Sequence, residues 1–569
     1  MCNYLNKSHR HNFSQWFKIN KVLSFREKLV FYSLLLLLIS SIFGWGQFYY
    51  FSKTEEKPDF GGEYIEGIIG QPSHINPILS QSNETDEDLV QLIYSGLFKY
   101  DEKGNLKNDL AESYEISDDK TTYTVKLKRN IIWHDNQPLT ANDVIFTLNL
   151  ISDPAYKSPL RSSWKKIEFQ QLDDFSLQFK INEPYAGFLH SLTFKILPKH
   201  IWESVSPENF SLSPLNLETI GSGPYKYNTI QKDSKGNILT YKLLANPFYF
   251  EGKPYISKIT FNFYTDEDSA LDALNRKEIM GINSLSSQKI GAIKSQKNIS
   301  VYKVNLPRYL AVFFNQNKSV SLANDEVRKA LNLATNREEI LGHVLDNNGR
   351  PVYSPFLEGT LGYSNELGEK EFSPEKANNL LEEKGWKKND SGIRSKDGTD
   401  LKINLVTTDW EELKKTSEIL KSQWEKIGAE VNIQSFSISD IQQNYIRPRE
   451  YEAFLFGQIN GADPDPYSFW HSDQKNDPGL NLSRFGDAET DKIIEQARVE
   501  FDEEKRTQAY IDFQKKLFEE MPAVFLYSPD YIYPVSNSIK NVNLVFMLNP
   551  SQRFSDINLW YIKTKRVKK

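Results

Sequence analysis

A single apolar stretch near the N-terminus most constrains how this chain can fold. Residues 29–51 carry no charge and include five successive leucines. As a helix rising about 1.5 Å per residue, the stretch would reach roughly 34 Å, enough to cross the core of a bilayer. We therefore expect a basic cytoplasmic N-terminus over 1–28, a transmembrane anchor over 29–51 and a linker over 52–60.

The charges on either side of this stretch predict its orientation. The basic residues that precede it include Lys18, Lys21, Arg26 and Lys28. Because basic flanks stay in the cytoplasm, the bulk of the chain should be extracytoplasmic, in the periplasm or at the cell surface. Two alternatives remain: a buried core helix, and a signal peptide cleaved near the small residues at 40–46. The stretch exceeds a usual signal core, and no A-x-A-like site follows it.

Composition bounds what the rest of the chain can be. Of 569 residues, 39% are hydrophobic and 13% aromatic, which is typical of two to four globular domains. The net charge of -6 argues against a nucleic-acid partner. Cys2 is the one cysteine, so the chain can form neither an internal disulfide nor a multi-cysteine zinc site.

Hydrophobic periodicity predicts a mixed α/β (α+β) fold. Alternation of apolar and polar residues predicts three strands, at 121–127, 176–181 and 258–264. Spacings of three and four predict five amphipathic helices, at 325–334, 374–384, 410–427, 487–500 and 503–520. Thr140 and Asp143 resemble a capping box at the start of a further helix, and the glycines at 221–223 predict a tight turn.

Catalytic and metal-binding signatures are missing from the sequence. No two of the eight histidines are four residues apart, and there is no HExxH, G-x-S-x-G or phosphate-loop motif. We therefore expect no enzyme activity, no catalytic residues, no bound metal and no cofactor. An enzyme built from scattered residues stays open as an alternative.

Six stretches in order carry a resemblance that covers residues 61–560. The most specific is WHDNQPLTANDV at 133–144, where Asn136 stands at a position that tolerates positive φ. The other stretches are GQPSHINP at 70–77, GSGPY at 221–225, the segment 246–255, the segment 315–338, and the segment from 451 through ADPDP at 462–466. This chain is similar to the family 5 extracellular solute-binding proteins, which include oligopeptide- and dipeptide-binding proteins of ABC importers.

The resemblance implies a two-lobed periplasmic-binding-protein-like fold with an extra subdomain, behind one N-terminal transmembrane helix. Lobe I would combine residues 61–95, 215–305 and 525–569, and the subdomain at 96–214 would pack on it. Lobe II would be residues 306–524. The ligand would be enclosed between the lobes when they close about a hinge.

The resemblance also implies where a peptide would bind. Two segments would add the peptide backbone as a strand: Glu66, Gly67, Ile68, Ile69 and Gly70 on lobe I, and Phe456, Gly457, Gln458, Ile459 and Asn460 on lobe II. Asp463, or else Asp465, would pair with the peptide ammonium group. Candidate partners for the peptide carboxylate are Arg308, Arg447 and Arg449, and candidate pocket aromatics are Trp410, Tyr467, Phe469 and Trp470.

The sequence thus predicts a monomeric receptor that captures peptides and delivers them to ABC permease subunits. The alternatives are a non-peptide solute such as a nickel chelate, an opine, a sugar or heme, and an anchored sensor or chaperone that uses the same cleft.

Overall fold

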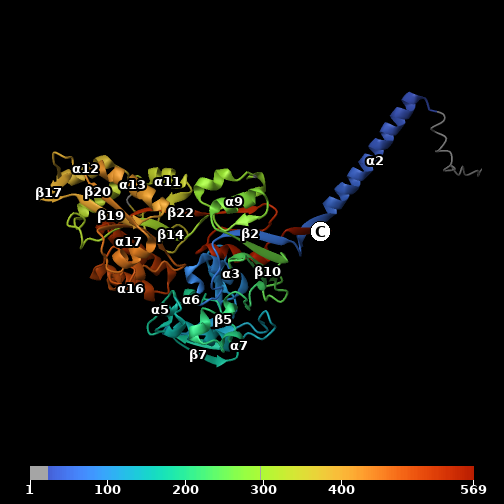
Figure 1. Ribbon diagram of the computed structural model, residues 1–569, viewed down its shortest axis with the longest axis horizontal. Coiled ribbons are helices and arrows are strands. Elements are labelled where there is room, and N and C mark those ends of the chain that lie inside the picture. Colours follow the sequence, from blue (N-terminus) through green and yellow to red (C-terminus); the bar gives the residue numbers. More distant parts are fainter. Residues whose placement is uncertain (1–22, 295, 369) are drawn as a thin grey trace, which may run out of the picture. The chain divides into compact units, whose positions relative to one another are not determined.

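The computed structural model describes residues 23–294, 296–368 and 370–569, and it divides into two compact units (Figure 1). One unit holds the chain up to Phe60 together with Lys563–Lys569, and the other holds Gly61–Ile562. Residues 1–22 of the predicted cytoplasmic segment lie outside the described part. The two end segments of the sequence therefore share one unit, and the long middle segment forms the other.

The first unit begins with a long exposed helix. Helix α2 (Phe25–Lys53) starts at Ser24, which forms a capping box with Glu27. None of its residues is buried, and among the described residues it is the one helix long and apolar enough to cross a membrane. It contains the whole predicted span of residues 29–51.

The segment predicted as a linker, residues 52–60, contains a strand. β1 (Thr54–Asp59) pairs antiparallel with β23 (Lys563–Lys568), a segment predicted to belong to lobe I. Opposite charges hold the two strands together: Asp59 Oδ1 lies 3.0 Å from Lys565 Nζ. Polar composition predicted a linker because neither strand has an apolar face, and the complementary charge lies at the far end of the sequence.

One twelve-stranded sheet runs through the second unit and joins its two lobes. The strand order is β20-β19-β21-β14-β22-β12-β2-β11-β10-β9, and β13 and β15 also pair with β22. The first half of β22 (Ala523–Ser536) pairs with β14 (Arg308–Phe314), and its second half pairs with β13 (Ile299–Asn305). The chain therefore crosses between the lobes twice, near Pro307 and near Pro529. Lobe I was predicted to resume at residue 525, yet the strand still pairs with lobe II two residues later.

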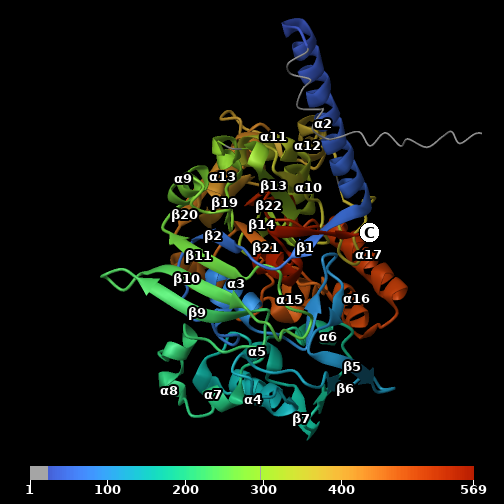
Figure 2. The same ribbon diagram turned by 90° about the vertical axis from the view of Figure 1, so that its right-hand side faces the viewer.

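Lobe I is the part of this sheet beyond β22, with helices packed on it (Figure 2). Its remaining strands are β2 (Glu63–Ile69), β9 (Tyr225–Lys232), β10 (Ile238–Ala245), β11 (Lys258–Tyr264) and β12 (Gly281–Ile282). Its helices and 3-10 turns are α3 (Glu84–Ile93), α9 (Glu267–Asn275), η2 (Ser80–Ser82), η5 (Ser287–Ala292), η6 (Gln296–Asn298), η9 (Pro550–Phe554) and η10 (Ile557–Leu559). β2 is parallel to both of its neighbours, β11 and β12.

The subdomain contains a four-stranded antiparallel sheet in the order β5-β6-β8-β7, a separate pair of strands, β3 and β4, and helices around them (Figure 2). Its strands are β3 (Phe98–Tyr100), β4 (Leu106–Asn108), β5 (Ala111–Ile116), β6 (Thr122–Leu127), β7 (Glu168–Asp173) and β8 (Ser176–Lys180). Its helices and turns are α4 (Ala141–Ser152), η3 (Pro154–Tyr156), α5 (Arg161–Trp164), α6 (Phe188–Ser191), α7 (Lys199–Trp202), α8 (Pro207–Phe210) and η4 (Pro214–Asn216). Its hydrophobic core is continuous with that of lobe I.

The lobe II part of the sheet has a hydrophobic core on each of its two faces. Along β14, Leu310, Val312 and Phe314 enter one core, while Tyr309, Ala311 and Phe313 enter the other. The other lobe II strands of this sheet are β15 (Gly349–Pro351), β19 (Lys402–Thr408), β20 (Glu430–Phe436) and β21 (Ala453–Ile459). A separate three-stranded sheet contains β16 (Lys387–Lys388), β17 (Arg394–Lys396) and β18 (Thr399–Asp400). The helices and turns are α10 (Asp325–Leu333), α11 (Arg337–Leu345), α12 (Pro374–Glu383), α13 (Glu411–Glu425), α14 (Ile438–Ile441), η7 (Gln442–Ile446), α15 (Tyr467–Trp470), η8 (Ser472–Gln474), α16 (Ala488–Val499) and α17 (Glu503–Glu520).

Two local predictions, one in the subdomain and one in lobe I, have different outcomes. The capping box of Thr140 and Asp143 is confirmed at the start of α4, and Asn136 has the positive φ of 71° that its position calls for. The glycines at 221–223 are needed for another reason than predicted. A Cβ at Gly221 would lie 2.0 Å from the carbonyl oxygen of Ile93, so the end of α3 packs directly against this backbone.

Candidate functional site

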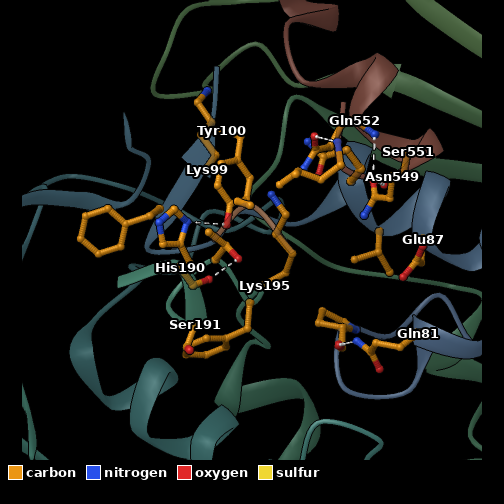
Figure 3. A pocket seen from close by; sticks show the side chains of 18 of the residues that line it. Gln81, Glu87, Lys99, Tyr100, His190, Ser191, Lys195, Asn549, Ser551 and Gln552 are labelled. Atoms are coloured by element: carbon orange, nitrogen blue, oxygen red, sulfur yellow. Dashed lines mark hydrogen bonds between the residues drawn. The ribbon is translucent and has the colours of Figure 1, made fainter. Parts of the chain in front are cut away.

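A cavity of about 400 Å³ lies where lobe I, the subdomain and lobe II meet (Figure 3). Lobe I contributes α3 and the η9 turn, the subdomain contributes β3 and residues 190–195, and lobe II contributes Gly461 and Ala462. In Figure 3, Tyr100 and Lys195 lie across from Glu87. The lobe II residues come immediately before the predicted Asp463, so the cavity adjoins that part of the predicted site.

Glu87 is a half-buried carboxyl group without a charged partner. It lies in the first turn of α3, beside Glu84, Asp86 and Asp88. Burial, followed by repulsion from these acids, raises the pKa of Glu87 to about 7. Its carboxylate makes no hydrogen bond or ion pair within the described chain. Among the described residues, no cation therefore pairs with this carboxylate to stabilise its ionised form.

Lys195 places the opposite charge on the facing wall. Its backbone pairs with Gly96 in an isolated bridge, and burial lowers the pKa of its ammonium group although Asp109 opposes the shift. The neighbouring Lys99 has its own partners, since it forms a salt bridge with Glu251 and lies 4.0 Å from Asp109 Oδ1. Lys195 Nζ makes no such pair among the described residues, so this cation also faces the cavity without a partner.

A second cavity, of about 600 Å³, lies directly between the two lobes. Lobe I lines it with residues 284–289 and 530–532, and lobe II lines it with Arg308, Glu411 and Glu412. Arg308 Nε is buried and has no hydrogen-bond partner in the described part of the chain. Of the three arginines predicted as partners of a ligand carboxylate, this is the one that the fold directs toward an interlobe cavity.

The predicted lobe II segment lies on a strand with one open edge. β21 pairs with β14 along its whole length, whereas β19 pairs with it only at Ala453 and Phe454. From Phe456 to Ile459, no strand in the described residues covers that second edge. Two of the predicted side chains in this segment, Gln458 and Asn460, are buried. Backbone groups along this edge can therefore accept an added strand.

The predicted lobe I segment has no such edge. β2 pairs with β11 over its full length, including the fully buried Ile68, and with β12 at Glu66 and Gly67. Ile69 N donates to Asn283 Oδ1 over 3.1 Å. Gly70 N donates to the carbonyl oxygen of Tyr264 over 3.0 Å. These backbone groups have partners inside lobe I, which leaves no free edge here for a peptide.

Glu66 instead belongs to a buried ionic cluster. Arg553 Nη2 donates to Glu66 Oε1 over 2.7 Å and to Asp88 Oδ2 over 2.6 Å. Tyr64 Oη donates to the other oxygen, Glu66 Oε2, over 2.6 Å, and Tyr533 Oη does so over 3.1 Å. The side chains of all three charged residues are at most 2% exposed. Glu66 therefore ties β2 to α3 and η9 rather than facing the ligand.

Asp463 and Asp465 both have protein partners. Asp463 Oδ2 lies 3.2 Å from Arg506 Nη1, and Tyr510 Oη donates to Asp463 Oδ1 over 3.2 Å. Asp465 Oδ2 accepts a hydrogen bond of 2.9 Å from Arg498 Nε. Burial raises the pKa of Asp465, although Arg498 opposes the shift. Both carboxylates are thus anchored by cations from α16 and α17.

These two acids lie at a direct contact between lobe II and the subdomain. Ala186 N donates to the carbonyl oxygen of Arg498 over 2.8 Å, and the Arg498 guanidinium lies 4.9 Å from the ring centroid of Tyr185. A Cβ on Gly187 would lie only 2.5 Å from Asp463 Oδ2. We call this contact, formed by Tyr185, Ala186 and Gly187 against Asp463 and Arg498, the closure seam. The two parts touch here, beside the first cavity.

The remaining predicted side chains divide between core and surface. Arg449 is buried, and its guanidinium donates only to backbone carbonyl groups of lobe II. Arg447 is exposed. Trp470 is a core residue, while Trp410 is 54% exposed and stacks near Phe456 on the open-edged strand. Trp410 therefore remains the candidate aromatic next to that edge.

Sequence reasoning missed Glu87, Tyr100, His190 and Lys195, all of which line the first cavity. The one signal in the sequence was the acidic run at 84–88, which looks like ordinary helix-start chemistry. Tyr100 Oη and His190 Nδ1 lie 3.1 Å apart, and burial lowers the pKa of His190. Within the described residues, no group of three or more His, Cys, Asp or Glu side chains could hold a metal ion.

Two lobes, two interlobe cavities and a strand that crosses between the lobes define the class of two-lobed solute-binding proteins. The profile of the bacterial extracellular solute-binding proteins, family 5, matches residues 105–479. The oligopeptide-binding protein AppA of Bacillus subtilis is 29% identical over 519 residues, which is 90% of this chain and 93% of that protein. This chain belongs to family 5 of the bacterial extracellular solute-binding proteins.

Solved structures agree with this assignment. The structure of AppA from Bacillus subtilis in complex with a nonapeptide matches with a TM-score of 0.70 and 28% identity, over 89% of this chain and all of that one. NikZ from Campylobacter jejuni in complex with Ni(L-His) matches with a TM-score of 0.72 and 25% identity, over 88% of this chain and 99% of that one. The family fold therefore holds different kinds of solute.

Proposed function

We propose that this protein is a membrane-anchored receptor that captures peptides between its lobes and delivers them to an ABC importer. The observation that carries the proposal is the open edge of β21, together with interlobe cavities lined by charges of both signs that have no partner among the described residues. A peptide has backbone groups to pair with an edge strand and terminal charges to pair with Glu87, Lys195 and Arg308. The similarity to a relative named as oligopeptide-binding supports the same ligand class.

Within this proposal, the ligand ammonium group pairs with Glu87. Asp463 was the predicted partner, but its two oxygens already contact Arg506 and Tyr510. The ligand carboxylate pairs with Lys195 or with Arg308, according to the length of the peptide. No covalent chemistry is needed, so we propose a receptor without enzyme activity that works as a monomer.

Calorimetry on residues 61–562, which form a compact unit of their own, tests the ligand class. We expect binding within a set of di- to hexapeptides, and no heat from any of them would contradict the peptide assignment. Glu87→Gln should weaken peptides with a free amine about 10- to 100-fold, the effect of losing one buried charged hydrogen bond. N-acetylated peptides should bind both forms alike. Asp463→Asn distinguishes the two candidate acids. If this variant, and not Glu87→Gln, selectively weakens peptides with a free amine, Asp463 is the partner of the ligand ammonium group.

A second candidate ligand is a nickel chelate, because NikZ in complex with Ni(L-His) shares this fold. The same calorimeter distinguishes it with Ni²⁺ and L-histidine as the titrants. We expect no saturable binding of that mixture. Saturable binding of Ni²⁺ with L-histidine, together with no heat from any peptide, would contradict the peptide proposal and favour the nickel chelate.

We also propose that α2 is retained in the mature protein as an anchor. Support comes from its length and from β1, which starts directly after it and pairs with the C-terminal strand. N-terminal sequencing of protein from cell membranes tests this proposal. A start between residues 40 and 50 would show a cleaved signal peptide instead.

A further inference from the structure

Three lysines gather where α2 ends and the small sheet begins. Lys53 is the last residue of α2, and Lys568 is paired in register with Thr54. Lys569 N donates to the carbonyl oxygen of Lys53 over 3.1 Å. All three lysines are exposed. The first and last parts of the sequence thus contribute to one basic cluster, which we call the exit cluster.

The exit cluster is not neutralised by its surroundings. The acids of β1 have other partners: Glu55 lies 3.0 Å from Lys57, and Glu56 lies 3.3 Å from Arg566. Asp59 pairs with Lys565, at the end of the β1–β23 strand pair away from α2. Among the residues that the structure describes, the three exit-cluster lysines form no ion pair. Their positive charges are therefore free to bind an anion from outside the chain.

Arg566 fixes this cluster to the helix end. Its guanidinium lies 4.4 Å from the ring centroid of Phe51, and Arg566 Nη2 donates to the carbonyl oxygen of Thr54 over 2.9 Å. The cation–ring contact and the backbone bonds hold β23 against the last turn of α2. The C-terminal lysines consequently stay near the helix exit.

The composition of α2 places this exit at a membrane surface. Exposed aromatic side chains cluster in its last turns, at Trp45, Tyr49 and Tyr50, which is typical of the interface between hydrocarbon and head groups. At about 1.5 Å per residue, Lys53 lies roughly 5 Å beyond Tyr50 along the helix. This distance brings the exit cluster to the level of lipid phosphate groups.

We propose that the exit cluster of Lys53, Lys568 and Lys569 binds anionic phospholipid head groups in the leaflet where α2 emerges. The inference rests on the proposed retention of α2 as an anchor. Three unpaired ammonium groups held at head-group depth complement phosphates, and each lysine near an anionic surface strengthens association about fivefold. The C-terminal strand is thereby fastened to the bilayer as well as to β1.

The test uses the full chain reconstituted in bilayers with spin-labelled phosphatidylglycerol or phosphatidylcholine. We expect the protein to immobilise phosphatidylglycerol preferentially. The triple variant K53Q/K568Q/K569Q should reduce this preference about twofold or more, with the remainder supplied by Arg26 and Lys28 at the other end of α2. About 1 M salt, where the screening length is about 3 Å, should abolish the difference.

A matched control variant loses the same number of positive charges as the exit-cluster variant. K384Q/K387Q/K426Q removes three exposed lysines of lobe II and should leave the lipid preference unchanged. An unchanged preference in the exit-cluster variant would overturn the lipid inference, and so would an equal loss in both variants. Alkaline carbonate extraction separates this failure from loss of the anchor: wild type and variants should all stay in the membrane. Release of the wild-type chain would refute the anchor and the inference together.

Discussion

Arg553 allows a stringent test of the structural role that the fold gives to Glu66. Its guanidinium is the cation between two fully buried carboxylates, Glu66 and Asp88. Arg553→Met keeps a long side chain but leaves both acids without a cation. Breaking a buried ion pair by removing one partner destabilises a protein by about 3–5 kcal/mol. We expect a loss of unfolding free energy in that range at pH 7.

The pKa shifts of the two acids predict how the destabilisation by Arg553→Met changes with pH. Burial raises the pKa of both Glu66 and Asp88 in the folded protein, and loss of Arg553 removes the interaction that opposes the rise. A carboxyl with a raised folded pKa binds a proton that unfolding releases. Stability therefore falls as pH rises from the unfolded pKa, about 4, toward the folded pKa, by about 1.4 kcal/mol per pH unit and carboxyl. The variant should approach wild type as the pH is lowered toward 5.

Urea unfolding of residues 61–562 between pH 5 and pH 8 measures both effects. Arg449→Met is the matched control, because Arg449 is equally buried but donates only to backbone carbonyls. The difference in unfolding free energy between Arg449→Met and wild type should stay the same across this pH range. A stability of Arg553→Met within about 1 kcal/mol of wild type, or the same pH slope in both variants, would refute the argument that Arg553 stabilises buried acids.

Three further predictions concern the cleft. Binding of a peptide with a free amine should strengthen from pH 6 to about pH 7.5, because Glu87, with a pKa of about 7, becomes ionised there while the peptide amine, with a pKa of about 8, is still charged. Glu87→Gln should remove this rise from the calorimetric profile. Gly187→Ala should weaken binding and enlarge the particle in X-ray scattering, since the new Cβ meets Asp463 at the closure seam, whereas Gly291→Ala, with open space around it, should match wild type in both. Arg308→Met should weaken peptides with a free carboxylate about tenfold and spare their C-terminal amides, and equal effects on both would exclude the proposed role.

Local patterning was sufficient to predict a minority of the regular elements of the second unit, those with a clear apolar period. The predicted strand at 258–264 and the predicted helix at 503–520 coincide with β11 and α17. Both have an apolar period that one face of a sheet or helix explains without knowledge of distant residues. The ribbon of β1 and β23 escaped prediction, because its strands pair through charges contributed by opposite ends of the sequence.

The candidate site depended on contacts that no local pattern contains. Sequence resemblance placed Asp463 and Asp465 beside the cleft, but Arg506 and Arg498, which neutralise them, come from helices 43 and 33 residues further along the chain. Glu66 was predicted to lie in a segment that pairs with the ligand backbone, yet its side chain pairs with Arg553, which lies 487 residues away. Whether an acid faces a ligand or a buried arginine is decided by the fold as a whole.

The division between paired and unpaired acids suggests how the ligand and closure are linked. At the closure seam, the charged groups of lobe II already form ion pairs with one another. Contact with the subdomain there therefore leaves no buried charge without a partner charge. Glu87 and Lys195 differ, because burial shifts the pKa of both groups and neither has a hydrogen-bond or ion-pair partner among the described residues. A closed form without ligand is therefore penalised at these two residues, and a ligand that provides an ammonium and a carboxylate removes that penalty. Since a ligand shifts a conformational equilibrium only by its different affinities for the two states, these unpaired charges are where a peptide would favour the closed form.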